Sequence, residues 1–236
     1  MEISVNRAAT PYFSKVGQEQ TPVFILDNFL ENLTPTLLSN LDQLSFDQAP
    51  TYYPGIRAKL PDEYMIAVAK ALVPLLHKIY GIPADYQVEF FDSYYSLVTR
   101  KPHELTIEQQ IPHFDGTEQF RFALLHYLNP HPHGGTAFYR HNASQTERVF
   151  EANVEQFLSS VSRQFEQNGG PKGQYIADTD SQFTKIGEIP FSQNRMAIYP
   201  GNLLHSGVIN PATDIDASPN TGRLTANMFI NFRHPM

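Results

Sequence analysis

Residues 222–232 have the sequence GRLTANMFINF, and their side chains alternate between two chemical classes. The apolar set is Leu224, Ala226, Met228, Ile230 and Phe232. The opposite set is Arg223, Thr225, Asn227, Phe229 and Asn231. Because successive residues of a strand point to opposite faces, this pattern predicts a strand that covers a core with one face and lines a polar cavity with the other. A half-exposed edge strand with a solvated arginine is the alternative.

Short segments of the same kind occupy most of the chain from residue 86 onward. They are rich in aromatic and β-branched residues and are separated by turn signals, which is typical of strands. The segments are YQVEFFDSYYSLVT (86–99), FRFALLHYLN (120–129), GGTAFYRH (134–141) and RMAIYP (195–200). With the strand at 222–232, they predict a β-sandwich or barrel.

The N-terminal part, residues 1–85, is predicted to be a helical layer. Residues 62–81 have helical spacing, acidic residues at the start and Gly81 as a stop signal. Leu37, Leu38, Leu41 and Leu44 also fall on one helical face. Residues 21–30 begin with a strand-like apolar run, and residues 51–64 are predicted to form a loop.

One helical insertion interrupts the strands, at about residues 141–185. Its apolar residues, among them Phe157, Leu158 and Val161, recur at helical spacing and are followed by two glycines. The helix is interpreted as a lid, a brace or a dimerisation element. The whole chain is therefore expected to form a single domain, 1–236, with a core at 86–236.

Composition limits the classes of function. The net charge of −7 disfavours a phosphate backbone as a partner. The absence of cysteine excludes disulfides, thiolate nucleophiles and iron–sulfur clusters. No signal-peptide core and no apolar stretch of about 18 residues is found. We therefore expect a soluble, cytoplasmic protein that binds neither nucleic acid nor membrane.

Two segments carry candidate metal ligands. His113 and Asp115 are separated by one residue, so in an extended chain both side chains point the same way. His205 follows a probable strand and a Pro-Gly turn in MAIYPGNLLHSGV (196–208). Each segment alone has a simpler explanation, a polar patch at the first and a core histidine at the second. Two histidines and one carboxylate together match a facial iron site, which leaves three positions open for a 2-oxo acid and dioxygen.

Other histidines and one basic loop are weaker candidates. His131 and His133 are spaced like a metal pair, but no glutamate follows at the required distance, so a turn is the preferred interpretation. His126 alternates with Tyr127 and is expected to face away from the cavity. His103 and His141 could contact substrate from loops. Arg57 and Lys59, in YPGIRAKLP (53–61), are solvated or contact an anionic substrate.

The segments HFD (113–115), LLHYLN (124–129), GGTAFY (134–139), YPGNLLHSGV (199–208) and RLTANMFINF (223–232) resemble, in order, the 2-oxoglutarate and iron(II)-dependent oxygenases of the prolyl-hydroxylase-like branch. A poorly characterised bacterial family of that superfamily is more similar still, through DNFL (27–30) and YPGIR (53–57). The resemblance implies an α+β, mainly β fold built on a double-stranded β-helix, or jelly roll.

The resemblance also implies site roles. His113, Asp115 and His205 would be the catalytic iron(II) ligands, Arg223 would bind the distal carboxylate of 2-oxoglutarate, and Tyr127 and Thr225 would assist. The chain departs from the family in the spacing between His205 and Arg223, eighteen residues instead of about ten, and in the insertion at 141–185.

The function expected is hydroxylation of a small molecule or a protein side chain, coupled to decarboxylation of 2-oxoglutarate to succinate. A non-catalytic jelly-roll scaffold and another metal-dependent activity of the same three ligands are the alternatives. A homodimer through the amphipathic insertion is a further expectation.

Overall fold

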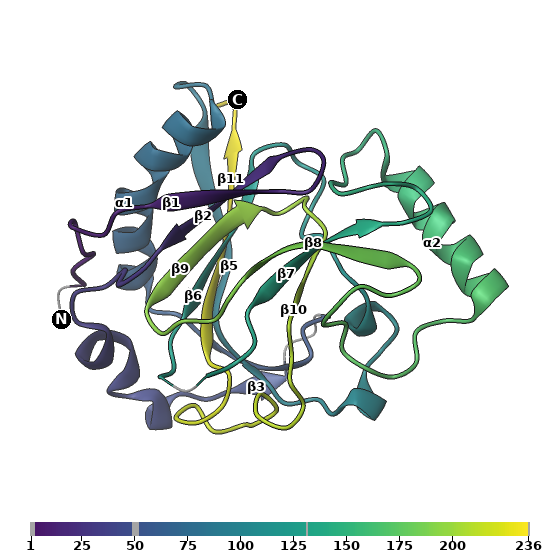
Figure 1. The fold of residues 1–236 in the computed structure, drawn as a ribbon. Coiled ribbons are helices and arrows are strands. Elements are labelled where there is room, and N and C mark those ends of the chain that lie inside the picture. The colour runs from purple at the N-terminus through teal and green to yellow at the C-terminus, as the bar shows by residue number, and fades with distance from the viewer. Residues whose placement is uncertain (1–2, 49–51, 131, 236) are drawn as a thin grey trace.

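The computed structural model describes residues 3–48, 52–130 and 132–235. In these ranges the chain forms two antiparallel β-sheets with a helix on either side (Figure 1). In spatial order, the large sheet contains β1 (Tyr12–Val16), β2 (Thr21–Leu26), β9 (Arg195–Pro200), β6 (Arg121–Tyr127), β11 (Thr225–Arg233), β5 (Gln87–Val98), β4 (Gly55–Lys59) and β3 (Asp47–Gln48). The small sheet contains β10 (His205–Gly207), β7 (Thr136–His141) and β8 (Phe183–Ile189).

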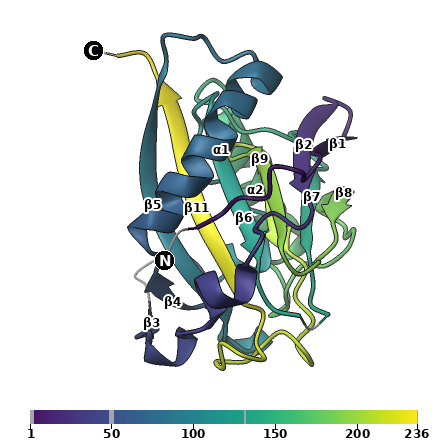
Figure 2. The ribbon, with the colours of Figure 1, turned by 90° about the vertical axis from the view of Figure 1, so that its left-hand side faces the viewer.

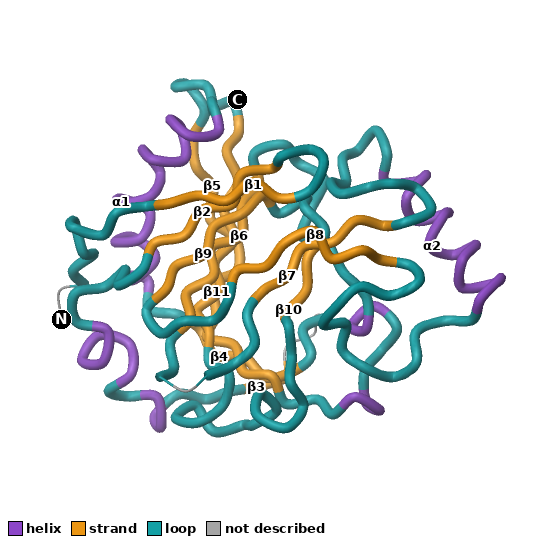
Figure 3. Tube along the Cα trace, in the orientation of Figure 1, coloured by secondary structure: helices purple, strands orange, loops and turns teal. Residues whose placement is uncertain are grey.

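The two long helices are α1 (Asp62–Tyr80) and α2 (Val154–Asn168). A short π-helical turn lies at Thr34–Leu38, and 3-10 turns lie at Leu41–Gln43, Pro102–Glu104 and Glu108–Gln110. Figure 3 shows the helices on both sides of the strands. The mainly β, jelly-roll-like sandwich expected from the sequence is therefore confirmed. None of the helices in the described ranges combines the length and the apolar character needed to span a bilayer.

Helix α1 covers the outer face of the large sheet (Figure 2). Tyr64, Val68, Leu72 and Leu76 recur every four residues, are buried and belong to the largest apolar cluster. The apolar set of β11 packs in the same cluster, as its alternation predicts. Gly81 ends the helix in the left-handed conformation, with φ of 62°. Burial of each large apolar side chain contributes about 1.5–3 kcal/mol to this layer.

A second apolar cluster fills the space between the sheets. Leu125 and Tyr127 from the large sheet meet Phe138 and Ile189 from the small sheet there. A third cluster lies on the outer face of the small sheet, where Phe157 of α2 packs. The sandwich therefore has four layers, and the polar face of β11 is turned toward the interior between the sheets.

The prediction for residues 1–85 was wrong in part. β2 and α1 agree with it, but β4 lies within the segment that was predicted to be a loop. The leucines at 37–44 form two short turns and no continuous helix. Four strands, β1 to β4, add to the edges of the large sheet instead of forming a helical layer. Strand pairing overrides the local sequence pattern here. A strand added to the edge of a sheet is stabilised by backbone hydrogen bonds to its neighbour, and a local sequence that contains Pro and Gly does not reveal these bonds.

His126 lies under α1 and faces away from the interior cavity, as predicted. Its Nε2 is 3.0 Å from Oδ1 of Asn194, and its Nδ1 is 2.9 Å from the hydroxyl of Tyr64. An amide oxygen can only accept, so Nε2 donates and Nδ1 accepts from Tyr64. The ring also meets Phe29 edge-on. His126 is therefore a neutral structural histidine.

Burial lowers the pKa of His126 from 6.5 to about 4. Between these values the unfolded chain binds more protons than the folded one, so stability is expected to fall as the pH drops from 6.5 toward 4. The full difference corresponds to about 3 kcal/mol. Urea unfolding at pH 7.5 and pH 5 measures the part of this difference that is lost above pH 5, about 2 kcal/mol. His126→Gln is expected to have a smaller loss between the two pH values, and an unchanged loss in this variant would contradict the assignment.

Candidate metal centre

His113 and His205 are brought together by a reciprocal pair of backbone hydrogen bonds. The N–H of each donates to the carbonyl of the other, at 2.9 Å in both directions. An antiparallel bridge of this kind puts both side chains on one side of the chain. Their ring centroids lie 4.3 Å apart. The 91 residues between them in the sequence include both β7 and α2, so only the fold makes them neighbours.

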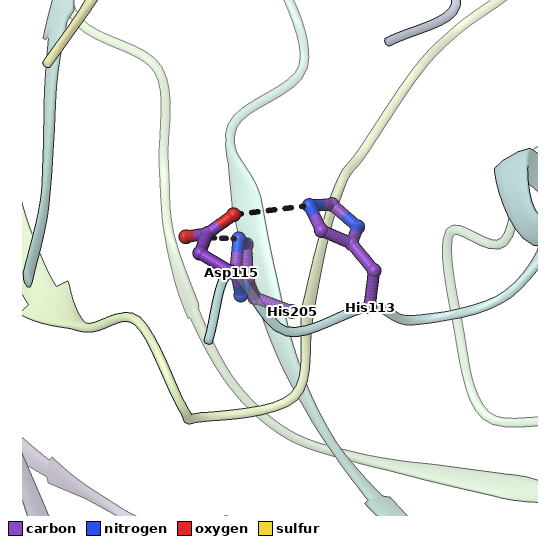
Figure 4. Close-up of side chains that lie close together, drawn as sticks. All are labelled: His113, Asp115 and His205. Atoms are coloured by element: carbon purple, nitrogen blue, oxygen red, sulfur yellow. Dashed lines mark ion pairs between the residues drawn. The ribbon is translucent and has the colours of Figure 1, made fainter. Parts of the chain in front are cut away.

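Asp115 completes the group. Its backbone N–H donates to the carbonyl of Gly201 at 2.7 Å, which keeps residues 113–115 beside the turn that leads to β10. Its Oδ1 is 3.9 Å from Nε2 of His113, and its Oδ2 is 3.6 Å from Nε2 of His205 (Figure 4). One ligand atom of each of the three residues lies within 4.8 Å of the others. A single ion can therefore contact all three.

The His205 ring is held in a defined state. Its Nδ1 is 2.7 Å from the carbonyl of Leu203, which can only accept, so Nδ1 carries the proton. The lone pair is then on Nε2, the atom that faces Asp115. A backbone carbonyl that fixes the second ring nitrogen is the usual support of a metal-bound histidine.

The charges at the site also suit a cation. Desolvation lowers the pKa of His205 to about 4. The pKa of His113 is lowered to about 4, first by desolvation in the cavity and second by the neighbouring His205 charge. Burial raises the pKa of Asp115, against the opposing charges of His113, Arg121 and Arg57. Oδ2 of Asp115 is buried and has no hydrogen-bond partner in the described residues. A buried carboxylate oxygen without a partner is costly, and a metal ion would satisfy it.

The three residues line a cavity of about 550 Å³. Its walls come from the inner faces of the two sheets and from α2. The wall from the large sheet includes Ala123 of β6, Tyr199 of β9 and Phe229 of β11. The wall from α2 includes Phe157 and Val161. This volume is in the range of about 300–1,000 Å³ that is typical of small-molecule sites. The insertion predicted at 141–185 therefore reaches the site.

Arg223 also lines this cavity, although it follows His205 by eighteen positions in the sequence. It is 4% exposed, its Nε donates to the carbonyl of Gly134 at 2.7 Å, and its Nη2 donates to that of Gly135 at 2.9 Å. The guanidinium is thus fixed in orientation by the segment that leads into β7. The long spacing does not remove the arginine from the site.

The loop before Arg223 is anchored by Asp214, which is fully buried. Its carboxylate accepts hydrogen bonds from the backbone N–H of Gly134 and of Asn210, and it pairs with Nδ1 of His133 at 2.9 Å. A side chain at position 134 would collide with the carbonyl of Val208, so glycine is required for this close approach. The additional residues therefore form a bound loop, and β11 keeps its register.

Tyr127 and Thr225 are buried residues close to this arginine. Both are fully buried, and neither is among the described residues that line the cavity. The Tyr127 hydroxyl is 2.9 Å from Oγ1 of Thr136, and its ring lies 5.8 Å from Cζ of Arg223. Thr225 donates to Oδ1 of Asn227 at 2.7 Å. Their contact with a bound ligand stays a prediction.

None of the remaining histidines that the structure describes joins the site. His141 is the last residue of β7 and not part of a loop; its ring is buried between Ser144 and Gln164, so the predicted substrate contact was wrong. His103 lies in a 3-10 turn and is absent from the cavity wall. His133 pairs with Asp214, as described above, and His131 lies outside the described residues.

The sequence analysis did not identify Arg121 and Tyr199 as residues of the site. Arg121 of β6 lines the cavity beside Asp115, and its Nη1 donates a hydrogen bond to Oε1 of Glu118 at 3.2 Å. Tyr199 of β9 packs edge-on against the His205 ring, with centroids 4.8 Å apart. Tyr199 pairs with Ala123, which pairs with Phe229, so all three share the inner face. The register of the sheet was the only signal that could have found them.

The fold and these side chains define a jelly-roll-like β-sandwich with a candidate metal centre between its sheets. The chain belongs to the DUF6445 family, described as a family of unknown function, and the match covers residues 7–230. No curated protein matches the chain at a significant level.

Similar solved structures include HygX from Streptomyces hygroscopicus with nickel and 2-oxoglutarate bound, at 11% identity and a TM-score of 0.47. The same protein with hygromycin B also bound has a TM-score of 0.48. Each covers 90% of this chain and 84% of its own. AviO1 from Streptomyces viridochromogenes Tue57 is 15% identical, with a TM-score of 0.39, and the match covers 86% of this chain and 79% of that one.

Proposed function

We propose that this protein is an iron(II)- and 2-oxoglutarate-dependent oxygenase with a double-stranded β-helix fold. One observation carries the proposal. His113, Asp115 and His205 offer three ligand atoms within 4.8 Å of one another, and Oδ2 of Asp115 is buried without a hydrogen-bond partner in the described residues. Two histidines and one carboxylate with open positions are the ligand set of non-haem iron(II) oxygenases.

The residues around the triad support the same reaction. Nε2 of His205 and Nε2 of His113 would hold the metal together with Asp115. Arg223 would bind the distal carboxylate of 2-oxoglutarate, because its guanidinium is already oriented and permanently charged. The apolar wall from α2 would exclude water from the reacting centre.

The bound iron would supply dioxygen activation. The overall reaction converts a substrate C–H bond, 2-oxoglutarate and dioxygen into a hydroxylated product, succinate and carbon dioxide. Phe157 and Val161 face the cavity, so the substrate would lie between the metal and α2.

The test is anaerobic. Iron(II) is added to metal-free protein, followed by 2-oxoglutarate, and the visible spectrum is recorded. A metal-to-ligand charge-transfer band is expected, because 2-oxoglutarate chelates the iron through its keto oxygen and C1 carboxylate. Bound iron without a band would point to another metal-dependent activity, and no iron binding would point to the scaffold role.

A further inference from the structure

The carboxylate of Asp214, in the long loop before β11, is fully buried. Its two oxygens accept four hydrogen bonds. Oδ2 accepts from the backbone N–H of Gly134 at 3.0 Å and from that of Asn210 at 2.9 Å. Oδ1 accepts from Nδ1 of His133 at 2.9 Å and from the hydroxyl of Thr213 at 3.1 Å. Asp214 therefore connects this loop to the segment that leads into β7.

Gly134 joins this carboxylate to Arg223 through its backbone. The N–H of Gly134 donates to Asp214, and its C=O accepts from Nε of Arg223 at 2.7 Å. The C=O of Gly135 accepts from Nη2 of Arg223 at 2.9 Å and also from the backbone N–H of Val208 at 3.0 Å. Asp214 and Val208 thus hold the backbone whose two carbonyls bind the guanidinium.

These bonds decide which edge of the Arg223 guanidinium is left for a ligand. A guanidinium carries five N–H donors in a planar fork. Nε and Nη2 form one edge, and the carbonyls of Gly134 and Gly135 occupy it. The second edge, formed by Nη1 and Nη2, is not used by these bonds, and a carboxylate can bind such an edge with two parallel hydrogen bonds. Because Arg223 lines the cavity, its orientation decides whether this second edge meets a ligand there.

A chain of aromatic contacts runs from the same segment back to the arginine. The ring of His133, which directly precedes Gly134, packs edge-on against Phe191 with centroids 5.1 Å apart. Phe191 packs against Tyr127 with centroids 4.8 Å apart, and Cζ of Arg223 lies 5.8 Å from the centroid of the Tyr127 ring. The guanidinium is therefore held by backbone bonds at one edge and by an aromatic ring beside it.

The charge of Asp214 gives the role of this residue a sign that can be measured. Desolvation raises the pKa of Asp214, but hydrogen bonds from His133, Asn210 and Gly134 and the charge of Arg223 together lower it below its usual range, so the carboxylate is ionised. A negative charge near Arg223 weakens the attraction of the arginine for an anion. By charge alone, removal of Asp214 would strengthen anion binding, whereas loss of orientation would weaken it.

We propose that Asp214 is a positioning residue for the binding of 2-oxoglutarate. Because it holds the backbone of Gly134, it keeps the second edge of Arg223 turned toward the distal carboxylate of the 2-oxo acid. This inference rests on the proposed oxygenase function, in which Arg223 binds that carboxylate. The long spacing between His205 and Arg223 supplies the loop that carries Asp214. A binding side chain keeps its productive geometry when hydrogen bonds of this kind hold it.

Two 2-oxo acids test the proposal: 2-oxoglutarate and 2-oxopentanoate, which has a methyl group in place of the distal carboxylate. Each is titrated anaerobically into the iron(II)-loaded protein, and the charge-transfer band gives its affinity. The wild-type protein is expected to prefer 2-oxoglutarate. Asp214→Ala is expected to weaken 2-oxoglutarate binding by about 10-fold or more, as for loss of a hydrogen bond to a charged group. Its affinities for 2-oxopentanoate and for iron(II) are expected to stay unchanged, because neither ligand uses Arg223.

Two further changes at the same position separate orientation from folding. In Asp214→Asn the amide oxygen can accept from the N–H groups of Gly134 and Asn210, as Oδ2 of Asp214 does, so this variant is expected to retain most of the affinity for 2-oxoglutarate. Asp214→Thr has a side chain of similar volume and lacks both carboxylate oxygens. It is expected to show the same selective loss as Asp214→Ala, and it replaces that variant if Asp214→Ala does not fold.

Asp216→Ala is the matched control in the same loop. The carboxylate of Asp216 accepts from the backbone N–H of Ser218 and from the hydroxyl of Thr221, and it makes no bond to Gly134. This variant loosens the loop without releasing the backbone beside Arg223. It is expected to keep the wild-type affinity for both 2-oxo acids.

Three results would overturn the positioning role. The first is an unchanged or higher affinity of Asp214→Ala for 2-oxoglutarate, and the second is an equal loss for both 2-oxo acids, which would mean that Asp214 only stabilises the fold. The third comes from the double variant. In Arg223→Lys, the additional change Asp214→Ala is expected to have little further effect, because the two residues act as one unit, so additive losses would refute the route through Arg223.

The wild-type titrations separate this inference from the proposed function. A 2-oxoglutarate band without preference over 2-oxopentanoate would leave the metal chemistry standing and overturn the positioning role, because the distal carboxylate would then have no arginine partner. Absence of a band in the wild-type protein would refute the oxygenase function and the positioning role together.

Discussion

His205→Ala is expected to lower the affinity for iron(II) by more than about 100-fold and to abolish 2-oxoglutarate turnover. Loss of a residue that only supports a ligand typically costs 10- to 100-fold in metal affinity, and loss of a ligand costs more. His205 offers Nε2 as a ligand atom, and its tautomer is already fixed by the carbonyl of Leu203. Anaerobic titration with iron(II) and a succinate assay measure the two effects.

His103→Ala is the control for this variant, because His103 lies outside the cavity wall in the described residues. It is expected to bind iron(II) as the wild-type protein does. The backbone bridge between residues 113 and 205 does not depend on the side chain, so circular dichroism is expected to show an intact fold in His205→Ala. Retained iron affinity or retained turnover would refute the ligand assignment.

Arg223→Lys is expected to weaken 2-oxoglutarate binding by about 10- to 100-fold and to leave iron(II) binding unchanged. A hydrogen bond to a charged group contributes about 1.5–3 kcal/mol, and lysine cannot reproduce the planar fork of arginine. Nε and Nη2 are already used by the carbonyls of Gly134 and Gly135, which hold the plane of the guanidinium. Titration of the charge-transfer band with 2-oxoglutarate gives the affinity.

The same change removes two partners of backbone carbonyls in the segment before β7. Each unsatisfied buried group costs about 1–3 kcal/mol, so Arg223→Lys is also expected to lower the melting temperature. Arg233→Lys is an exposed change in β11, and it is expected to change neither the affinity for 2-oxoglutarate nor the melting temperature. An unchanged affinity for 2-oxoglutarate in Arg223→Lys would remove the arginine from the proposed site and leave it a structural role.

The local sequence pattern was sufficient to predict the elements whose two faces differ clearly in polarity. The alternation at 222–232 predicted β11, its buried face and its cavity face, because one side of this strand meets the apolar cluster under α1 and the other meets the cavity. The spacing of His113 and Asp115 predicted a shared direction. Helix α1 was predicted with its ends, because its periodicity and its glycine stop are local signals.

Pairing between segments far apart in the sequence decided the remaining features of the fold and of the site. The pairing of His113 with His205, the fixed tautomer of His205 and the bound loop before Arg223 depend on contacts between segments far apart in sequence. The register of the sheet decides that β4 is a strand. It also decides that Arg57 points inward opposite Ser96. The sequence by itself determined which side chains could bind a metal and which faces are apolar. The tertiary structure decided which of them meet, because strand partners are chosen by hydrogen bonds and packing that no local window of the sequence contains.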